Sequence, residues 1–204
     1  MEKAISLDEF LSFEKRYRAN FGNSLSGYKG AHLLGTINEN KQTNLALFNS
    51  VVHLGANPPY LGFVLRPTTV PRHTYQNIRS TSFFTINHVL VKHYETAHQT
   101  SAKYDEAISE FAACGFTPQF TETHPAPYVQ ECSIKIGLQL EEEHYIKAND
   151  TRFIVGKVVE VLVPEEHIGP KGHIHLSDAG SVAVVGLEEY YETTYLKNMG
   201  YARP

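Results

Sequence analysis

Apolar and polar residues alternate over several stretches of this 204-residue chain, while shorter stretches carry apolar residues at helical spacing. The helical spacing predicts a helix that fills most of residues 1–22, a short helix over 73–79 and a third over 101–114. Ser6 and Glu9 have the spacing of a capping box, which favours a helix start immediately after Ser6. Helices therefore account for a minor part of the chain.

The remaining periodic stretches predict strands, and most are separated by turn residues rich in Gly, Pro and Asn. The predicted strands cover residues 28–37, 43–54, 60–65, 82–89, 129–140, 153–163 and 181–186. The first two form a hairpin. Because strands do not alternate regularly with helices, the pattern indicates a mainly β protein, a closed or nearly closed antiparallel barrel with flanking helices. We expect one domain over 1–204, ending in a tail over 187–204.

Composition supports a globular protein and excludes several other classes. With 42% apolar and 20% charged residues, the chain is long enough to bury one full core. The formal net charge of −4 leaves no basic surplus for nucleic acid, and no stretch approaches the roughly 20 apolar residues of a membrane helix. We therefore expect a cytoplasmic protein without nucleic-acid or membrane partners. Cys114 and Cys132 lack CxxC spacing, so we expect buried thiols without a disulfide or metal site.

The predicted strand around residues 43–50 has an unusual polar face. At a period of two, Asn44, Ala46 and Ser50 lie on one face, and Asn49 lies on the other. Small and polar side chains pack poorly in a core, but they allow a flat polar ligand to approach the backbone. The alternative is an edge strand whose polar residues are simply solvated.

A second unusual segment is the loop over 66–74, which is stiffened by two prolines and runs into a predicted helix. Two arginines, Arg66 and Arg72, lie here among several hydroxyl side chains. Free N–H groups and the helix dipole favour an anion at such a helix start. The alternative is an ordinary helix cap with solvated arginines.

Other site chemistries lack their motifs. The chain has 11 histidines, including His173 and His175, but no HExxH and no Cys/His cluster, so a metal site is not indicated. The absence of GxSxG argues against a serine nucleophile. No GxGxxG follows a strand, so a nicotinamide cofactor would bind as a transient substrate and not in a Rossmann unit.

The same residues resemble the flavin-reductase-like family, the FMN-binding split barrels, and in particular its longer members of about 200 residues. The resemblance extends from about Ser24 to the C-terminus. It is carried by segments in a characteristic order, namely 34–36, 50–52, 57–59, 61–64, 71–74, 77–78, 84–87, 109–111, 113, 115–117, 156–158, 186–187 and 190–191.

The resemblance implies FMN as the cofactor and assigns candidate contacts. Candidates for the ring and ribityl chain are Asn44, Ala46, Asn49 and Ser50. Candidates for the phosphate are Thr68, Thr69, Arg72, His73 and Thr74. The segment over 98–103 resembles the family's loop over the flavin, which adds Thr100, Ser101 and Lys103. Tyr190 or Tyr191 is expected to cover the ring from the C-terminal tail.

The implied activity is that of a homodimeric flavin oxidoreductase. Hydride would pass from NADH or NADPH to FMN, and the electrons would leave to an acceptor that the sequence does not identify. Two alternatives stay open at this point. The first is a non-catalytic FMN carrier or electron-transfer flavoprotein. The second is a split-barrel protein that binds another phosphate-bearing ligand or haem.

Overall fold

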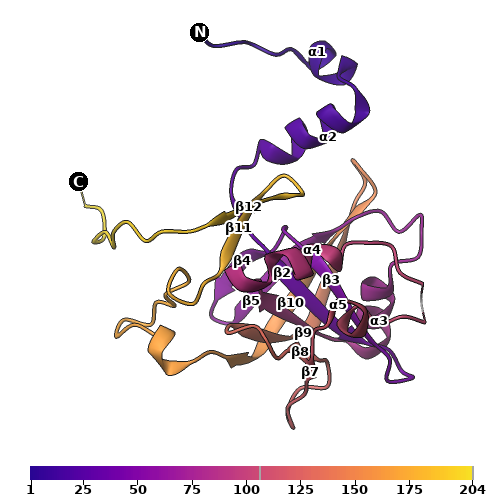
Figure 1. Ribbon diagram of the computed structural model, residues 1–204, viewed down its shortest axis with the longest axis vertical. Helices are drawn as coiled ribbons and strands as arrows, with labels where there is room; N and C mark the ends of the chain where they lie inside the picture. The colour runs from indigo at the N-terminus through magenta and orange to yellow at the C-terminus, as the bar shows by residue number, and fades with distance from the viewer. Residues whose placement is uncertain (106, 204) are drawn as a thin grey trace.

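The computed structural model describes residues 1–105 and 107–203, and strands dominate it (Figure 1). The strands are β1 (Lys29–Gly30), β2 (His32–Ile37), β3 (Thr43–Phe48), β4 (Val52–Ala56), β5 (Pro59–Leu65), β6 (Phe83–His88), β7 (Pro118–Gln119), β8 (Tyr128–Val129), β9 (Lys135–Ile146), β10 (Thr151–Leu162), β11 (Val182–Val185) and β12 (Glu189–Glu192). The helices are α1 (Leu7–Ser12), α2 (Lys15–Ser24), α3 (His73–Thr81), α4 (Tyr94–Gln99) and α5 (Glu110–Cys114), with 3-10 turns η1 (Val91–His93) and η2 (Glu165–His167). The predicted mainly β, split-barrel class is confirmed.

Seven strands form the main sheet in the order β3-β2-β6-β9-β10-β5-β4, with every neighbouring pair antiparallel. β3 and β4 follow one another in the chain but occupy its two opposite edges, and they do not pair. The sheet is therefore not closed, which leaves the nearly closed form of the two expected barrels, and the predicted strand over 43–54 is interrupted at residues 49–51. A second sheet has the order β1-β11-β12.

The sheet buries a core on each face. Side chains alternate along β2, so Leu34 enters one core with Phe63 and Phe84, while Leu33 enters the other with Leu45. The first core is the barrel interior, and Ile78 of α3 helps to close it. The second core includes apolar residues of α4, α5 and β11. β2 is thus buried along its whole length, as a strand covered on both faces must be.

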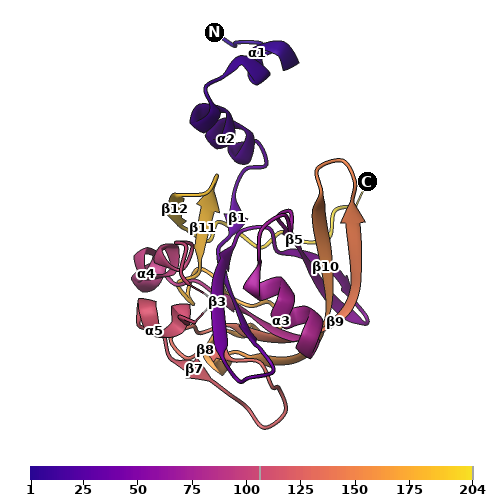
Figure 2. The ribbon, with the colours of Figure 1, turned by 90° about the vertical axis from the view of Figure 1, so that its right-hand side faces the viewer.

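The predicted N-terminal helix is two helices, α1 and α2. Phe13 has extended backbone angles at the end of α1, and the Glu14 carboxylate accepts the N–H groups of Arg16 and Tyr17 at 2.8 and 3.1 Å. Glu14 therefore caps a new helix and does not continue the first one. Figures 1 and 2 show both helices projecting from the body of the protein.

The helix predicted over 101–114 is helical only at Glu110–Cys114 within the described residues, and position 106 lies outside them. The stripe that suggested the longer helix is buried only at its end, at Phe111, since Ala107 and Ile108 are exposed. A separate helix, α4, precedes this segment, at Tyr94–Gln99. Cys132 is buried as expected, but Cys114 is only half-buried.

The late strands are displaced from their predicted bounds. The strand predicted over 129–140 is divided between β8 and β9, and the tail over 187–204 contains β12. β9 and β10 form the long hairpin visible in Figure 2. Across the described residues, no helix is long and apolar enough to span a membrane.

Candidate functional site

The polar beginning of β3 meets the first turns of α3. Asn44 Nδ2 donates to Thr74 Oγ1 at 3.1 Å and to Thr36 Oγ1 at 3.3 Å. Asn77 Nδ2, one turn further along α3, donates to the same Thr36 oxygen at 3.1 Å. All four side chains are buried. Since buried polar groups are stable only when they are hydrogen-bonded, this network fixes the strand against the helix.

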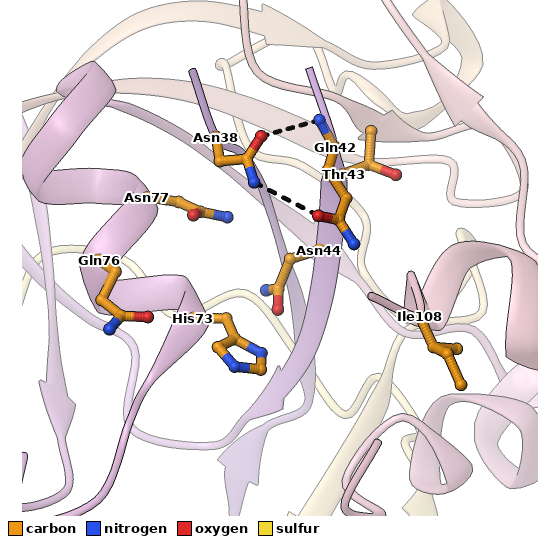
Figure 3. A pocket seen from close by; sticks show the side chains of 8 residues that line it. All are labelled: Asn38, Gln42, Thr43, Asn44, His73, Gln76, Asn77 and Ile108. Atoms are coloured by element: carbon orange, nitrogen blue, oxygen red, sulfur yellow. Dashed lines mark hydrogen bonds between the residues drawn. The ribbon is translucent and has the colours of Figure 1, made fainter. Parts of the chain in front are cut away.

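A small polar pocket opens beside this network (Figure 3). It lies between the end of the β2–β3 hairpin and α3. The residues that line it are Asn38, Gln42, Thr43, Asn44, His73, Gln76, Asn77 and Ile108. Asn38 holds the turn of the hairpin, because its Oδ1 accepts the Gln42 N–H at 2.9 Å. Amides and one imidazole dominate the lining, which suits a ligand rich in hydroxyl or phosphate oxygens.

The start of α3 is a helix N-terminus without a side-chain cap. Arg72 is the N-cap residue, and its side chain does not bond the first-turn N–H groups. Its Nε donates instead to Pro67 O at 3.3 Å, across the loop that precedes the helix. Thr68 is half-buried and Thr69 exposed in that loop. Uncapped N–H groups beside a guanidinium form an electropositive position for an anion.

Within the described part of the chain, no strand pairs with the outer edge of β3. The Leu45 N–H points away from β2 and is accepted by Glu110 Oε2 at 3.0 Å. By strand periodicity, the Leu47 N–H points in the same direction, further along this edge. Ala46 lies on the same strand face as Asn44. The second half of β3 therefore directs one backbone donor, the Leu47 N–H, away from β2.

The two residues after β3 have structural partners. Asn49 Nδ2 donates to Gly186 O at 2.6 Å, which ties the end of β3 to the second sheet. Ser50 Oγ donates to Val64 O at 3.0 Å and accepts the Val64 N–H at 3.1 Å. Ser50 thus links the end of β3 to β5 where the barrel is split.

The hydroxyls of the segment over 98–103 complete α4. Thr100 Oγ1 donates to Ala97 O at 2.8 Å, and Ser101 Oγ donates to His98 O at 2.7 Å. Thr100 is buried, whereas Ser101 and Lys103 are exposed. These bonds fix the C-terminal end of the helix.

Tyr190 of β12 packs against α4. Its hydroxyl lies 3.0 Å from His98 Nδ1, and its ring centroid is 5.6 Å from that of Tyr94. Burial raises the pKa of Tyr190 to about 12, so the phenol is neutral at physiological pH. Tyr191 is exposed and contacts Tyr28 at 4.9 Å between ring centroids.

The structure thus brings three of the candidates, Asn44, His73 and Thr74, into one place. The other candidate side chains that form hydrogen bonds do so outside this cluster, either with neighbouring residues or with other strands and helices. Thr36, Gln76 and Asn77 were missed. Gln76 and Asn77 follow His73 by three and four positions, so helical spacing alone places them on the same side of α3.

Comparison with known proteins identifies the family of this chain. The flavin reductase like domain family matches residues 28–178. A split-barrel protein of Shewanella frigidimarina, provisionally described as a flavin reductase, is 43% identical, with a TM-score of 0.95 over 98% of this chain and 100% of that one.

Two more distant structures share the fold. Component B of nitrilotriacetate monooxygenase from Bacillus cereus is 17% identical, with a TM-score of 0.84 over 98% of this chain and 99% of that one. Flavoredoxin of Desulfovibrio vulgaris is 23% identical, with a TM-score of 0.76 over 98% of each chain. Since the family match covers most of the chain and the first structure aligns over nearly its full length, this chain belongs to the flavin reductase like family.

Proposed function

We propose that this chain is a single-domain flavoprotein that binds FMN between β3 and the start of α3 and works as an NAD(P)H-dependent flavin oxidoreductase. The observation that carries the proposal is the Asn44–Thr74 hydrogen bond of 3.1 Å. It joins the two segments that would hold the two ends of the cofactor. The family assignment supports a flavin as the ligand of this site.

The residues at the start of α3 fit the phosphate end of FMN. A dianion there would meet the Arg72 guanidinium and the uncapped N–H groups of the first helical turn. The hydroxyls of Thr68, Thr69 and Thr74 lie close in sequence, and His73 lines the adjoining pocket. Each would add a hydrogen-bonding group to an oxygen-rich ligand.

The ring end would lie along β3. The small Ala46 would let a planar group approach the strand. The Asn44 amide would supply a polar contact, and so would the Leu47 N–H, which by strand periodicity points away from β2. Asn49 and Ser50 would act through the strand position that they fix. Thr100 and Ser101 donate into α4 but keep acceptor capacity, and with Lys103 and Tyr190 they form the proposed cover.

When bound, a flavin supplies the hydride and electron-transfer chemistry, and the protein orients it and excludes water. The nicotinamide would bind transiently, because the chain lacks a Rossmann unit. We further propose that the protein is a cytoplasmic homodimer. The proposal names no electron acceptor.

The test is anaerobic reduction of the FMN-loaded protein. Mixing with NADH or NADPH is expected to bleach the visible flavin band much faster than in free FMN at the same concentration. If neither nicotinamide bleaches a band that dithionite does bleach, the reductase proposal fails and an FMN carrier or electron-transfer flavoprotein replaces it.

A further inference from the structure

Glu110 is a buried carboxylate that lies outside the group of side chains around the pocket. It is the first residue of α5 and is 8% exposed. Its Oε2 accepts the N–H of Leu45, which is 65 positions away in sequence, at 3.0 Å. A buried carboxylate is costly unless it is hydrogen-bonded, so this position is built around the contact with β3.

The contact replaces a missing strand. β3 pairs with β2 along one edge, and no strand pairs with its other edge among the described residues. An N–H group on that edge, buried beneath α5, would lose a hydrogen bond unless a side chain supplied the acceptor. The Glu110 carboxylate supplies it and leaves the next donor along the edge, the Leu47 N–H, without this cover.

Two neighbours of Glu110 make the contact rigid. Phe111 is 1% exposed and lies in the same core cluster as Leu45, so the start of α5 cannot move away from β3 without opening that core. Ser109 Oγ lies 2.8 Å from Thr43 Oγ1, which adds a second bridge between the two elements. The three consecutive residues Ser109, Glu110 and Phe111 thus all hold α5 against β3.

Three consecutive residues of β3 are fixed from different directions. Thr43 is held by Ser109, Asn44 by Thr74, and Leu45 by Glu110. We propose that Glu110 is a positioning residue for the flavin: by holding the free edge of β3, it keeps the Asn44 amide and the Leu47 N–H aimed at one ligand geometry. This inference rests on the function proposed above.

The test compares Glu110→Ala with Glu110→Gln. The alanine variant removes the acceptor for the Leu45 N–H, and it is expected to bind FMN roughly ten-fold more weakly. It should also change the visible circular dichroism of the bound flavin and speed hydrogen exchange in a peptide that covers residues 43–48. Glutamine keeps an acceptor oxygen with the same reach, so it should restore the spectrum and bring the affinity within roughly three-fold of wild type.

A matched control is Glu131→Ala, because Glu131 also accepts a backbone N–H, that of Thr117, at 3.1 Å. It should leave FMN affinity and the flavin spectrum unchanged. If Glu110→Ala is insoluble, Glu110→Asp, whose shorter side chain withdraws the acceptor, is measured with the same expectation.

The possible outcomes separate the two proposals. If wild-type protein binds FMN but Glu110→Ala matches it in affinity and spectrum, the positioning role is overturned and the proposed function stands. An equal loss in the alanine and glutamine variants, or in the Glu131 control, also overturns it. A wild-type protein without affinity for FMN removes the proposed function and the inference together.

Discussion

The two edges of the seven-stranded sheet differ in how they are covered. β3 is held by polar groups of α3 and α5, and its first half is nearly closed to solvent. β4 is exposed along almost its whole length, with Val52 and Leu54 at 45% and 46% exposure. Polar cover suits an edge that binds a small polar ligand, whereas an apolar exposed edge suits a protein surface. We therefore expect the proposed flavin at β3 and the proposed partner copy at β4.

The largest expected effect is the loss of the contact between β3, one edge of the sheet, and β5, which lies beside the other edge. Phe63 of β5 is fully buried and contacts the rings of Phe48, at the end of β3, and Phe84, with centroids at 5.1 and 5.6 Å. Phe63→Ala should lower the free energy of unfolding by about 3–5 kcal/mol, because it leaves a cavity inside the barrel. Urea denaturation measures this. Phe120→Ala, at an exposed site, should change it by less than about 0.5 kcal/mol, and equal losses would contradict the account.

The next effect is a loss of folding stability in acid, caused by His32 of β2 and His88 of β6. Burial lowers the pKa of His88 to about 4 and also lowers the pKa of His32, whose ring is 4.7 Å from it. The unfolded chain binds these protons near pH 6.5, whereas the folded chain resists them. Stability should therefore be full above about pH 6.5 and fall by on the order of 2–3 kcal/mol for His88 as the pH drops towards 4.

Denaturation curves between pH 7 and 4 measure this slope. His88→Gln should flatten it, and His53→Gln, on the exposed β4, should leave it as in wild type. A wild-type stability that does not change over this range would contradict the lowered pKa of His88.

A sharper test of the proposed flavin site, at the start of α3 beside β3, is Arg72→Ala. Losing a charge-assisted contact of about 1.5–3 kcal/mol should weaken the affinity for FMN roughly ten- to hundred-fold. Riboflavin, which has no phosphate, should lose far less. Titration of both flavins against both proteins measures the difference. Equal small losses for the two ligands would remove Arg72 from the site, as expected for a solvated arginine.

The smallest effect on folding is expected at β4. Leu54→Lys places a charge on the exposed edge, so it should change the free energy of unfolding by less than about 0.5 kcal/mol but weaken self-association. Light scattering at micromolar concentration should report a dimer for wild type and a shift towards monomer for the variant. Ile168→Lys, at a residue with 45% exposure, is the control and should stay dimeric. A wild-type monomer would refute the proposed use of this edge.

Much of the fold follows from residue patterns, since the two-residue period in β3, β5 and β10 reflects which side chains enter a core. The failures have local causes. The break between α1 and α2 depends on the Glu14 side chain capping a new helix, and helical spacing does not encode it. The stripe over 101–114 has helical spacing, but Ala107 and Ile108 are exposed and lack the tertiary burial that stabilises a helix, whereas Phe111 of α5 is buried.

The candidate site was predictable only where its residues are local in sequence. Asn44 and Thr74 were each identified from their own segment, but their contact joins positions 30 apart and is set by the packing of α3 on the sheet. Glu110 shows the same limit. Its sequence marks a helix start, whereas its partner Leu45 becomes known only when α5 packs beside β3. The sequence pattern does not show which residues far apart in the chain come into contact.

The central claim, that the β3 edge and the start of α3 hold a flavin, is tested most directly by titrating purified protein with FMN and identifying the released cofactor by mass. The account predicts visible flavin absorbance and about one FMN per chain. Failure to bind FMN at micromolar concentration would contradict it.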